Sequence, residues 1–491
     1  MPSPVRRPSQ GPELRPVLLM IGLLMVALGV SMILPAVVDY LTPPVGATQA
    51  FFGGAAAAVA LGGILIAANR GGMADISLRQ GYLFTVLAWV TVPALGALPL
   101  ALSPLGLSYT DAFFETMSGL TTTGSTVLVG LDTMPESILL WRAIMQWLGG
   151  IGIIVMAIAI LPWLRTGGMQ LFHAESSDRS DKPMPRLAQV TAWICLVYLA
   201  LSTLCAFGYR VTGMTRFDAV VHAMTTIATG GYASSDASFA AFPAAAQWVA
   251  VMFMIAGAAP FLLYVRAVRG DWSILRDRQV HVMLLVLLAA TVVLALWLHQ
   301  VVGRSLDEAL RAAAFNVTSI MTTTGYASDD YGLWGPLAVG VFFYLMFVGG
   351  CTGSTSGAIK IFRFRVLFIV LADHTSRRFM PHRMAPRSYD GRPLTVDVVE
   401  GVMAFLAVYF LTVAVIALAL SGFGLDWLTS LSGAVQAVGN IGPGLGPTIG
   451  PAGNFSTLPD GAKWILALGM LLGRLELFTV LVLLAPRFWR G

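Results

Sequence analysis

The phrase Thr121-Thr122-Thr123-Gly124-Ser125 occurs in four related copies along this chain, and these copies decide its fold. Each copy precedes a new hydrophobic stretch, and the spacing between copies is nearly regular. Four similar backbone loops around one axis would form a ring of carbonyl oxygens, which can replace the water shell of a bare monovalent cation. All four copies in one polypeptide predict a complete pore in a single chain. The other copies are Ala228-Thr229-Gly230-Gly231-Tyr232, Thr322-Thr323-Thr324-Gly325-Tyr326 and Asn440-Ile441-Gly442-Pro443-Gly444.

The composition indicates a protein with many membrane spans. Of the 491 residues, 57% are hydrophobic and only 11% are charged, whereas a soluble domain has about 25% charged residues. The net charge of +5 does not indicate nucleic-acid binding, because the basic residues lie in short loops between apolar runs. That distribution is the positive-inside pattern of membrane proteins, so the expected surroundings are a lipid bilayer. The three cysteines show no metal-ligand spacing.

The hydrophobic runs predict ten spanning helices, since about 20 apolar residues cross the hydrocarbon core. The first run is too long for the apolar part of a signal peptide, and we expect it to be a retained span. Arginine and lysine cluster in alternate loops and are absent from 40–46 and 103–137, so we expect both termini in the cytoplasm. The expected spans are 17–38, 47–69, 82–103, 138–164, 188–211, 244–268, 280–303, 335–372, 397–422 and 461–486.

The repeat predicts an all-α fold with pseudo-fourfold symmetry. Each unit reads as a spanning helix, a short amphipathic segment, a Thr/Gly loop and a second spanning helix. The short segments cannot cross a membrane, and irregular backbone at membrane depth is tolerated where it lines a cavity, so we expect re-entrant pore helices. A pair of helices precedes the first unit. The expected domains are the N-terminal pair at 1–80 and pore repeats at 81–170, 171–275, 276–385 and 386–491.

The residue types in the four loops suit a cation filter. Glycine reaches backbone angles that let successive carbonyls point to one side, and threonine offers a hydroxyl as well as a carbonyl oxygen. A pore helix that ends at such a loop directs the negative end of its dipole towards the axis, which favours a cation. The candidate ion-binding residues are Thr122, Thr123, Gly124, Thr229, Gly230, Gly231, Thr323, Thr324, Gly325, Asn440, Ile441 and Gly442.

Carboxylates recur near the start of the short segments. Asp111 and Asp218 each lie thirteen residues before the filter glycine, and Asp307 and Asp426 open the third and fourth segments less regularly. They fit either N-caps of the pore helices or an acidic outer mouth that concentrates cations. Glu115 lies inside the first segment, where we expect it to brace the filter by hydrogen bonds rather than touch the ion.

A second motif interrupts the long apolar stretch 335–372. The run Gly349-Gly350-Cys351-Thr352-Gly353-Ser354-Thr355-Ser356-Gly357-Ala358-Ile359-Lys360 fails the phosphate-binding P-loop pattern, because Ala358 follows Gly357. A Gly/Ser/Thr break within a span is tolerated where it lines a water-filled cavity. We interpret it as a mobile gate loop below the filter, with a packing kink as the alternative. The candidate gate residues are Gly350, Thr352, Gly353, Ser354, Thr355, Ser356, Gly357, Lys360 and Arg474.

Two ionisable residues of the last span, Arg474 and Glu476, are expected to be functional, because charges inside a membrane are costly. Two roles are consistent with Arg474: it supplies a positive charge on the conduction path, or it forms an internal ion pair with a carboxylate. Glu476 is an unsuitable partner for it, because residues two apart face different sides of a helix. Lys360 either belongs to the gate or extends to the cytoplasmic interface.

With these motifs the chain resembles the Trk/Ktr/HKT superfamily of potassium transporters, and within it the bacterial TrkH/TrkG membrane subunits. The resemblance extends over nearly the whole length and includes the N-terminal pair, the four units and the fourth loop, Asn440–Gly446. The segment Gln170–Ser177 also resembles the first long cytoplasmic loop of that family.

The resemblance implies properties that the residues alone do not show. Such proteins carry potassium inward across the bacterial inner membrane as homodimers with one pore per subunit, and a cytoplasmic nucleotide-binding subunit of the TrkA type regulates them. The transported ion would be K⁺, with no organic cofactor in this chain. The four glycines match the filter glycines of the family, the segment 350–358 matches its intramembrane gate loop, and Arg474 matches its basic residue below the filter.

Three other functions remain as alternatives. A symporter that couples potassium to protons or sodium would need a buried titratable group, and few carboxylates lie within the spans. A membrane-embedded enzyme would need clustered catalytic residues at one membrane face, and no such cluster or Ser/His/Asp arrangement stands out. A purely structural scaffold would leave the four Thr/Gly loops unexplained.

Overall fold

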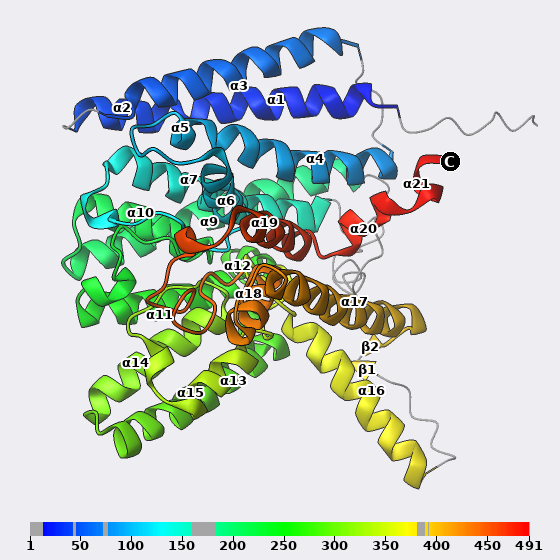
Figure 1. Cartoon of the computed structure of the whole chain (residues 1–491). Helices are drawn as coiled ribbons and strands as arrows, with labels where there is room; N and C mark the ends of the chain where they lie inside the picture. Colours follow the sequence, from blue (N-terminus) through cyan, green and yellow to red (C-terminus); the bar gives the residue numbers. More distant parts are fainter. Residues whose placement is uncertain are drawn as a thin grey trace, which may run out of the picture.

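The computed structural model describes residues 13–42, 46–71, 77–159, 183–380, 388–390 and 392–490 (Figure 1). These residues form helices joined by loops, together with one hairpin of two very short strands, β1 (Ser388–Tyr389) and β2 (Arg392–Pro393). The expected all-α fold class is confirmed. The segment Gln170–Ser177 and several basic loop residues of the orientation argument lie outside the described ranges.

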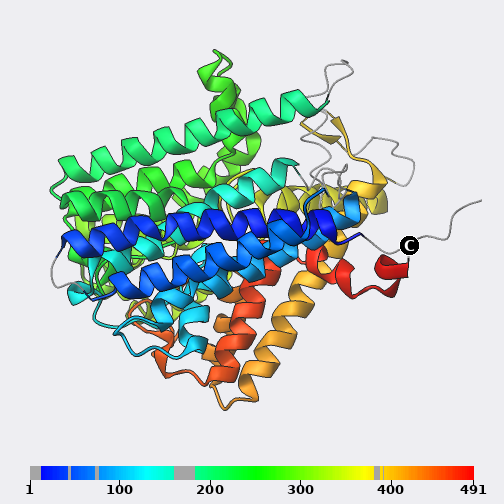
Figure 2. The same cartoon turned by 90° about the horizontal axis from the view of Figure 1, so that it is seen from above.

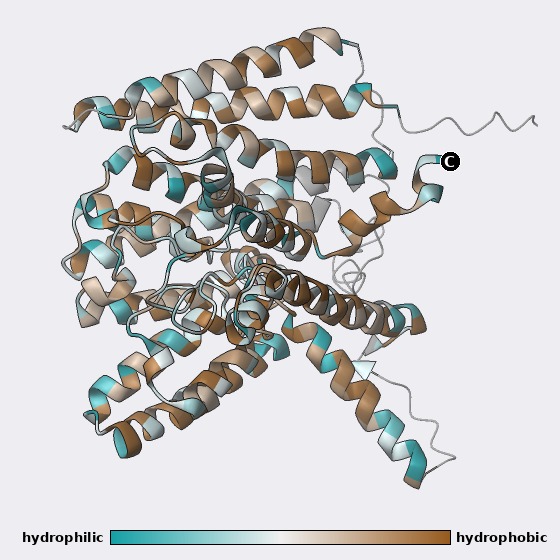
Figure 3. Ribbon diagram, viewed as in Figure 1, coloured by the Kyte–Doolittle hydropathy of each residue, from teal (hydrophilic) through white to brown (hydrophobic). Residues whose placement is uncertain are grey.

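The chain is a polytopic membrane protein by the length and hydropathy of its helices. Among the described residues, seven helices are long and apolar enough to cross a membrane, and up to nine if each of two bent pairs counts as one span. Apolar residues dominate these helices, and polar residues concentrate towards the ends of most of them (Figure 3). The described helix α1 begins at the same side of the molecule at which the chain ends (Figure 1).

Three of the ten expected spans are not continuous helices. The segment 335–372 is divided into α15 (Pro336–Leu345) and α16 (Ile361–Phe379), with the expected gate loop between them. The segment 244–268 bends by 93° between α11 (Ala244–Ala258) and α12 (Phe261–Val268), where Pro260 cannot continue the hydrogen-bond ladder. The segment 461–486 bends by 109° between α19 (Asp460–Arg474) and α20 (Phe478–Leu484).

The N-terminal helices pack through small residues. They are α1 (Arg15–Ser31), α2 (Ile33–Leu41) and α3 (Thr48–Ala68), and α1 and α3 lie side by side (Figure 1). A Cβ atom on Gly22 would lie 2.8 Å from the Gly62 carbonyl oxygen, and one on Gly62 would lie 2.6 Å from that of Gly22. Without a hydrophobic driving force between helices in lipid, such close backbone contact supplies the packing energy.

The remaining helices follow the expected order of long helix, short helix, loop and long helix. The short helices are α6 (Tyr109–Leu120), α10 (Arg216–Ile227), α14 (Leu306–Met321) and α18 (Trp427–Gly439), and each packs against the long helix before it. Those long helices are α4 (Leu78–Gly96), α9 (Pro183–Val211), α13 (Arg278–Trp297) and α17 (Val396–Ser421). Helix α7 (Glu136–Ala159) follows the first loop, and the short helices α5 (Leu98–Ala101) and α21 (Pro486–Arg490) complete the α-helices of the described residues.

Contacts between units run in one direction around the molecule. Helix α10 packs against α7, α14 packs against α11, and α6 packs against α19, so each of these short helices touches a long helix of the unit before it in cyclic order. Helices α17 and α19 of the last unit also lie side by side (Figure 2). The first and last units are therefore neighbours, and the units close into a ring.

Helix caps correct the expectation for three of the four carboxylates. The N-cap residues of α6 and α10 are Ser108 and Thr215, whose hydroxyls accept hydrogen bonds from the backbone amides of Asp111 and Asp218. Both aspartates, and Asp307 of α14 behind the N-cap Ser305, therefore lie in the first helical turn rather than at the cap. Their charge there still interacts favourably with the positive end of the helix dipole. Asp426 is the N-cap of α18, as expected, and accepts a hydrogen bond from the Thr429 amide at 3.1 Å.

Candidate functional site

Each short helix ends in the same backbone motif at the start of its Thr/Gly loop. Thr122, Thr229, Thr323 and Asn440 all have positive φ angles, between 50° and 58°. In every copy this residue donates its N–H to the carbonyl three residues back, and the next residue donates to the carbonyl five residues back, which is a Schellman motif. The left-handed position of this motif is normally glycine, and a β-branched residue there costs about 1–3 kcal/mol.

The strain at the threonines indicates that their hydroxyls are needed at this level of the loops. Glycine would relieve the strain but would remove the hydroxyl, which in Thr229 and Thr323 is hydrogen-bonded to the segment 350–358. The hydroxyl of Thr122 and the Asn440 carbonyl oxygen Oδ1 are both buried without a hydrogen-bond partner among the described residues. Unpaired buried oxygens at equivalent positions of two loops are suitable ligands for a dehydrated cation.

The four glycines that the sequence predicts for a filter form a closed ring of contacts. Each has a positive φ, and a Cβ atom on any of them would meet the carbonyl oxygen of a residue in the neighbouring loop. Gly124 faces the Gly230 carbonyl, and Gly231 faces the carbonyl of Thr324. Gly325 in turn faces Ile441, and Gly442 faces the Thr123 carbonyl and closes the circle. A side chain at any of these positions would collide with the backbone, so glycine is required for this approach.

The residue after each of the first three glycines reaches back to the preceding unit. The Ser125 hydroxyl donates to the Gly442 carbonyl at 2.8 Å, and the Tyr232 hydroxyl donates to the Glu115 carbonyl at 2.6 Å. The Tyr326 hydroxyl donates to the His222 carbonyl at 3.2 Å. These bonds hold the loops in the same cyclic order as the helix packing.

A buried ion pair supports the first two loops, and the sequence analysis predicted its glutamate but not its arginine. Glu115 accepts a hydrogen bond from Arg142 Nε at 2.8 Å, and both side chains are almost fully buried. Arg142 also donates to the Ala233 carbonyl and lies over the Tyr232 ring, while Glu115 accepts from the Val127 amide. The expectation that Glu115 braces the loops is therefore confirmed. A lone arginine at the start of an apolar span was the signal for its partner.

The expected gate loop lies directly against the inner ends of the Thr/Gly loops. The Gly357 amide donates to the Thr323 hydroxyl at 2.7 Å, and the Ala358 amide donates to the Gly439 carbonyl at 2.9 Å. The hydroxyls of Thr355 and Thr229 are 3.1 Å apart in a hydrogen bond. The loop is thus hydrogen-bonded to polar atoms at the ends of the short helices of units two, three and four.

Arg474 joins this loop to the first unit. Its guanidinium donates to the Thr355 carbonyl at 2.8 Å and to the Gly149 carbonyl of α7 at 3.2 Å. Glu476 instead pairs with Arg363 at the start of α16. The partners of Arg474 are therefore two carbonyl oxygens, and not the carboxylate that the sequence analysis gave as one alternative.

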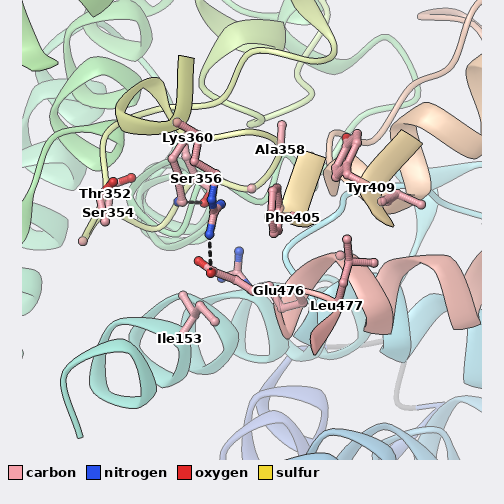
Figure 4. Close-up of a pocket in the computed structure, with 16 residues that line it drawn as sticks. Ile153, Thr352, Ser354, Ser356, Ala358, Lys360, Phe405, Tyr409, Glu476 and Leu477 are labelled. Carbon is pink, nitrogen blue, oxygen red and sulfur yellow. Dashed lines mark hydrogen bonds and ion pairs between the residues drawn. The ribbon is translucent and has the colours of Figure 1, made fainter. Parts of the chain in front are cut away.

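A pocket lies beside the expected gate loop, and its lining also includes Tyr409 and Glu476 (Figure 4). Lys360 and Ser356 lie close together at one side of it, and Glu476 lies across from them (Figure 4). Lys360 is buried and donates to the Ser356 carbonyl, so the expectation that it extends to the membrane interface is wrong. The lining also includes the gate residues Thr352, Gly353, Ser354, Gly357 and Arg474.

The structure separates the candidate gate residues into two groups. Thr355, Ser356 and Gly357 contact the filter loops, whereas Gly350, Thr352, Gly353 and Ser354 are anchored elsewhere. The Cys351 amide donates to the Ala258 carbonyl at 2.9 Å, and the Gly353 carbonyl accepts from the Phe261 amide at 3.0 Å. Among the described residues, no group of three or more His, Cys, Asp or Glu side chains could hold a metal ion.

Comparison with known proteins identifies the family. Residues 47–490 match the model of the family described as TrkH, cation transport protein. The chain belongs to the TrkH family. This is a family of transporters and not of enzymes, and the chain is a multi-pass membrane protein related to bacterial Trk proteins.

Relatives of the TrkH family match over most of the chain. A Trk system potassium uptake protein TrkI from Halomonas elongata is 53% identical over 84% of this chain and 85% of that protein. The Trk system potassium uptake protein TrkH from Salmonella typhimurium is 39% identical over 96% of this chain and 98% of that protein. The crystal structure of the potassium transporter TrkH from Vibrio parahaemolyticus is 34% identical, has a TM-score of 0.89, and matches 97% of this chain and 100% of that chain.

Proposed function

We propose that this TrkH-family protein takes up K⁺ across the bacterial cytoplasmic membrane through a filter made by its four Thr/Gly loops. The observation that carries the proposal is the closed ring in which each filter glycine faces a carbonyl of the next loop. Backbone carbonyls in such a ring replace the hydration shell of K⁺. The names of the relatives, which are potassium uptake proteins, support the choice of ion.

The segment 350–358 acts as the gate in this proposal. Its hydrogen bonds to Thr229, Thr323 and Gly439 support a position across the inner end of the filter. Arg474 holds the loop in that position and adds a positive charge below the filter. Withdrawal of the loop would open a path from the filter to the pocket lined by Lys360.

Assembly and orientation complete the proposal. We infer a homodimer with one pore per subunit, both termini in the cytoplasm, and regulation by a nucleotide-binding subunit of the TrkA type. The domains are the N-terminal pair at 1–80 and four pore repeats at 81–170, 171–275, 276–385 and 386–491. The loop charges, and the position of the start of α1 and the end of α21 at one side of the molecule, support this orientation.

Flux of ⁸⁶Rb⁺, used as a tracer for K⁺, into liposomes tests the proposal. We expect uptake that continues without a proton or sodium gradient, and uptake that requires such a gradient would favour the coupled symporter instead. In the variant Gly124→Ser, the new side chain would displace the Gly230 carbonyl, so we expect weaker discrimination of K⁺ from Na⁺. Unchanged selectivity in a well-folded Gly124→Ser protein would remove Gly124 from the filter.

A further inference from the structure

The second Thr/Gly loop lacks a side chain that the other three loops have. At the position before the filter glycine, the first, third and fourth loops carry Thr123, Thr324 and Ile441, whereas the second carries Gly230. The φ of Gly230 is not positive, so backbone conformation does not demand glycine there. Another constraint must therefore exclude a side chain from this position.

The side-chain amide of Gln146 fills the space in question. Gln146 lies on α7 and is fully buried. A Cβ atom on Gly230 would lie within 3.0 Å of all three terminal atoms of the Gln146 amide. Even alanine at 230 would therefore overlap with Gln146, and the glutamine takes the place of the missing side chain.

The same amide makes two hydrogen bonds to the second loop. Its nitrogen Nε2 donates to the Gly230 carbonyl at 2.5 Å, and its oxygen Oε1 accepts from the Tyr232 amide at 3.1 Å. The two bonds lie on either side of Gly231, one donated and one accepted, which fixes the orientation of the amide. The Gly230 carbonyl is also the one that faces Gly124 of the neighbouring loop.

We propose that Gln146 is a positioning residue that sets the ion selectivity of the pore through the Gly230 carbonyl. The inference rests on the proposed filter. It assigns to Gln146 the contact by which the second loop differs from the other three. A carbonyl that accepts a hydrogen bond from the protein keeps one lone pair for an ion. In the proposal, the hydrogen bond from Gln146 holds the Gly230 carbonyl back from the pore axis and weakens its electric field at the ion. Both effects favour K⁺ over the smaller Na⁺.

Replacement of Gln146 by methionine tests the proposal. Gln146→Met keeps the length of the side chain but removes both hydrogen bonds. A lost buried hydrogen bond changes an equilibrium about tenfold, so we expect the ratio of K⁺ to Na⁺ permeability to fall by about that factor. The ratio comes from reversal potentials of the full-length protein in planar bilayers under bi-ionic conditions.

Gln247 on α11 provides the matched control. It is a buried glutamine whose Nε2 donates to the carbonyls of Phe239 and Phe242, away from the filter. We expect Gln247→Met to lower the thermal stability but to leave the permeability ratio within twofold of the wild type. An equal loss of selectivity in both variants would overturn the proposal, because it would show a general effect of a lost buried amide.

A double variant separates the positioning role from a purely structural one. Gly230→Thr alone should abolish uptake because the new side chain collides with the Gln146 amide. Gln146→Ala combined with Gly230→Thr gives the second loop the threonine of the first and third loops and makes room for it. We expect uptake to return to within about threefold of wild type, and a double variant as inactive as Gly230→Thr would refute the exchange of one side chain for the other.

The measurements distinguish this proposal from the proposed function. If the wild type conducts and Gly124→Ser alters selectivity while Gln146→Met does not, the role of Gln146 is refuted and the filter stands. If the wild-type protein shows no K⁺ flux in bilayers, both proposals fail. Monodisperse elution in detergent establishes folding of each variant. If Gln146→Met is misfolded, the K⁺ to Na⁺ permeability ratio of the double variant, which also lacks both hydrogen bonds of Gln146, is the deciding measurement, and a wild-type ratio there refutes the proposal.

Discussion

Replacement of Arg474 by methionine should open the gate. In the structure the guanidinium makes two charge-assisted hydrogen bonds, to the Thr355 carbonyl at 2.8 Å and to the Gly149 carbonyl at 3.2 Å. Such bonds contribute about 1.5–3 kcal/mol each. We take the lower value for each bond, because water hydrates the guanidinium once the gate opens. The two hydrogen bonds together then contribute about 3 kcal/mol to the closed state. Because 1.4 kcal/mol is a factor of ten, the ratio of open to closed pores should rise by roughly 100-fold.

Single-channel recording in planar bilayers separates the two roles of Arg474. If the residue holds the loop closed, Arg474→Met raises the open probability and changes the unitary current little. If it acts only as a positive charge on the path, the unitary current rises and the open probability stays constant, which would refute the reasoning. Arg474→Lys keeps the charge without the planar fork, so we expect it to raise the open probability nearly as much.

Lys463 provides a matched control on the same helix. It is also buried, but it pairs with Asp111 at the opposite end of α19. We expect Lys463→Met to reduce the thermal stability and to leave the open probability unchanged. A similar rise in open probability for Lys463→Met would show that any lost cation on α19 loosens the gate.

Three further perturbations test other parts of the structure. Glu115→Gln should lower the free energy of unfolding by about 3–5 kcal/mol because it leaves Arg142 buried without a counter-charge, and the added Arg142→Met should recover part of the loss in a thermal melt in detergent. Deletion of 352–356 should raise ⁸⁶Rb⁺ flux into liposomes, and a silent, folded protein would contradict the gate assignment. Gly22→Leu should separate α1 from α3 and lower the melting temperature, while the K⁺ to Na⁺ permeability ratio of the folded fraction stays unchanged.

The sequence predicted the elements that depend on local pattern. Ten hydrophobic runs, four short amphipathic segments and the Gly/Ser/Thr break at 349–360 follow from composition and spacing, because lipid selects long apolar helices and tolerates irregular backbone only where it is buried or lines a cavity. The bends at Pro260 and Glu476 did not emerge, since hydropathy sums over about 20 residues and does not sense direction. The structure shows both as sharp breaks.

Contacts between distant segments could not be predicted from the sequence pattern. Arg142 and Gln146 are isolated polar residues in an apolar span, and only the fold places them beside Glu115 and Gly230. Lys360 was ambiguous for the same reason, because a lysine at a helix end can reach the interface or turn inward. Its partner, the Ser356 carbonyl, exists only once the gate loop has folded back.

The gate loop and the bend at Pro260 depend on each other. The proline ends α11 and frees the carbonyls of Gly257 and Ala258, which then accept hydrogen bonds from the Thr355 hydroxyl at 2.9 Å and the Cys351 amide at 2.9 Å. A buried carbonyl without a partner costs about 1–3 kcal/mol, so the loop can leave its site only if water reaches both oxygens. Opening of the gate and hydration of the pocket are therefore one event. A pore held dry, for example by a large apolar side chain in place of Ser354, should stay closed even when Arg474 is removed.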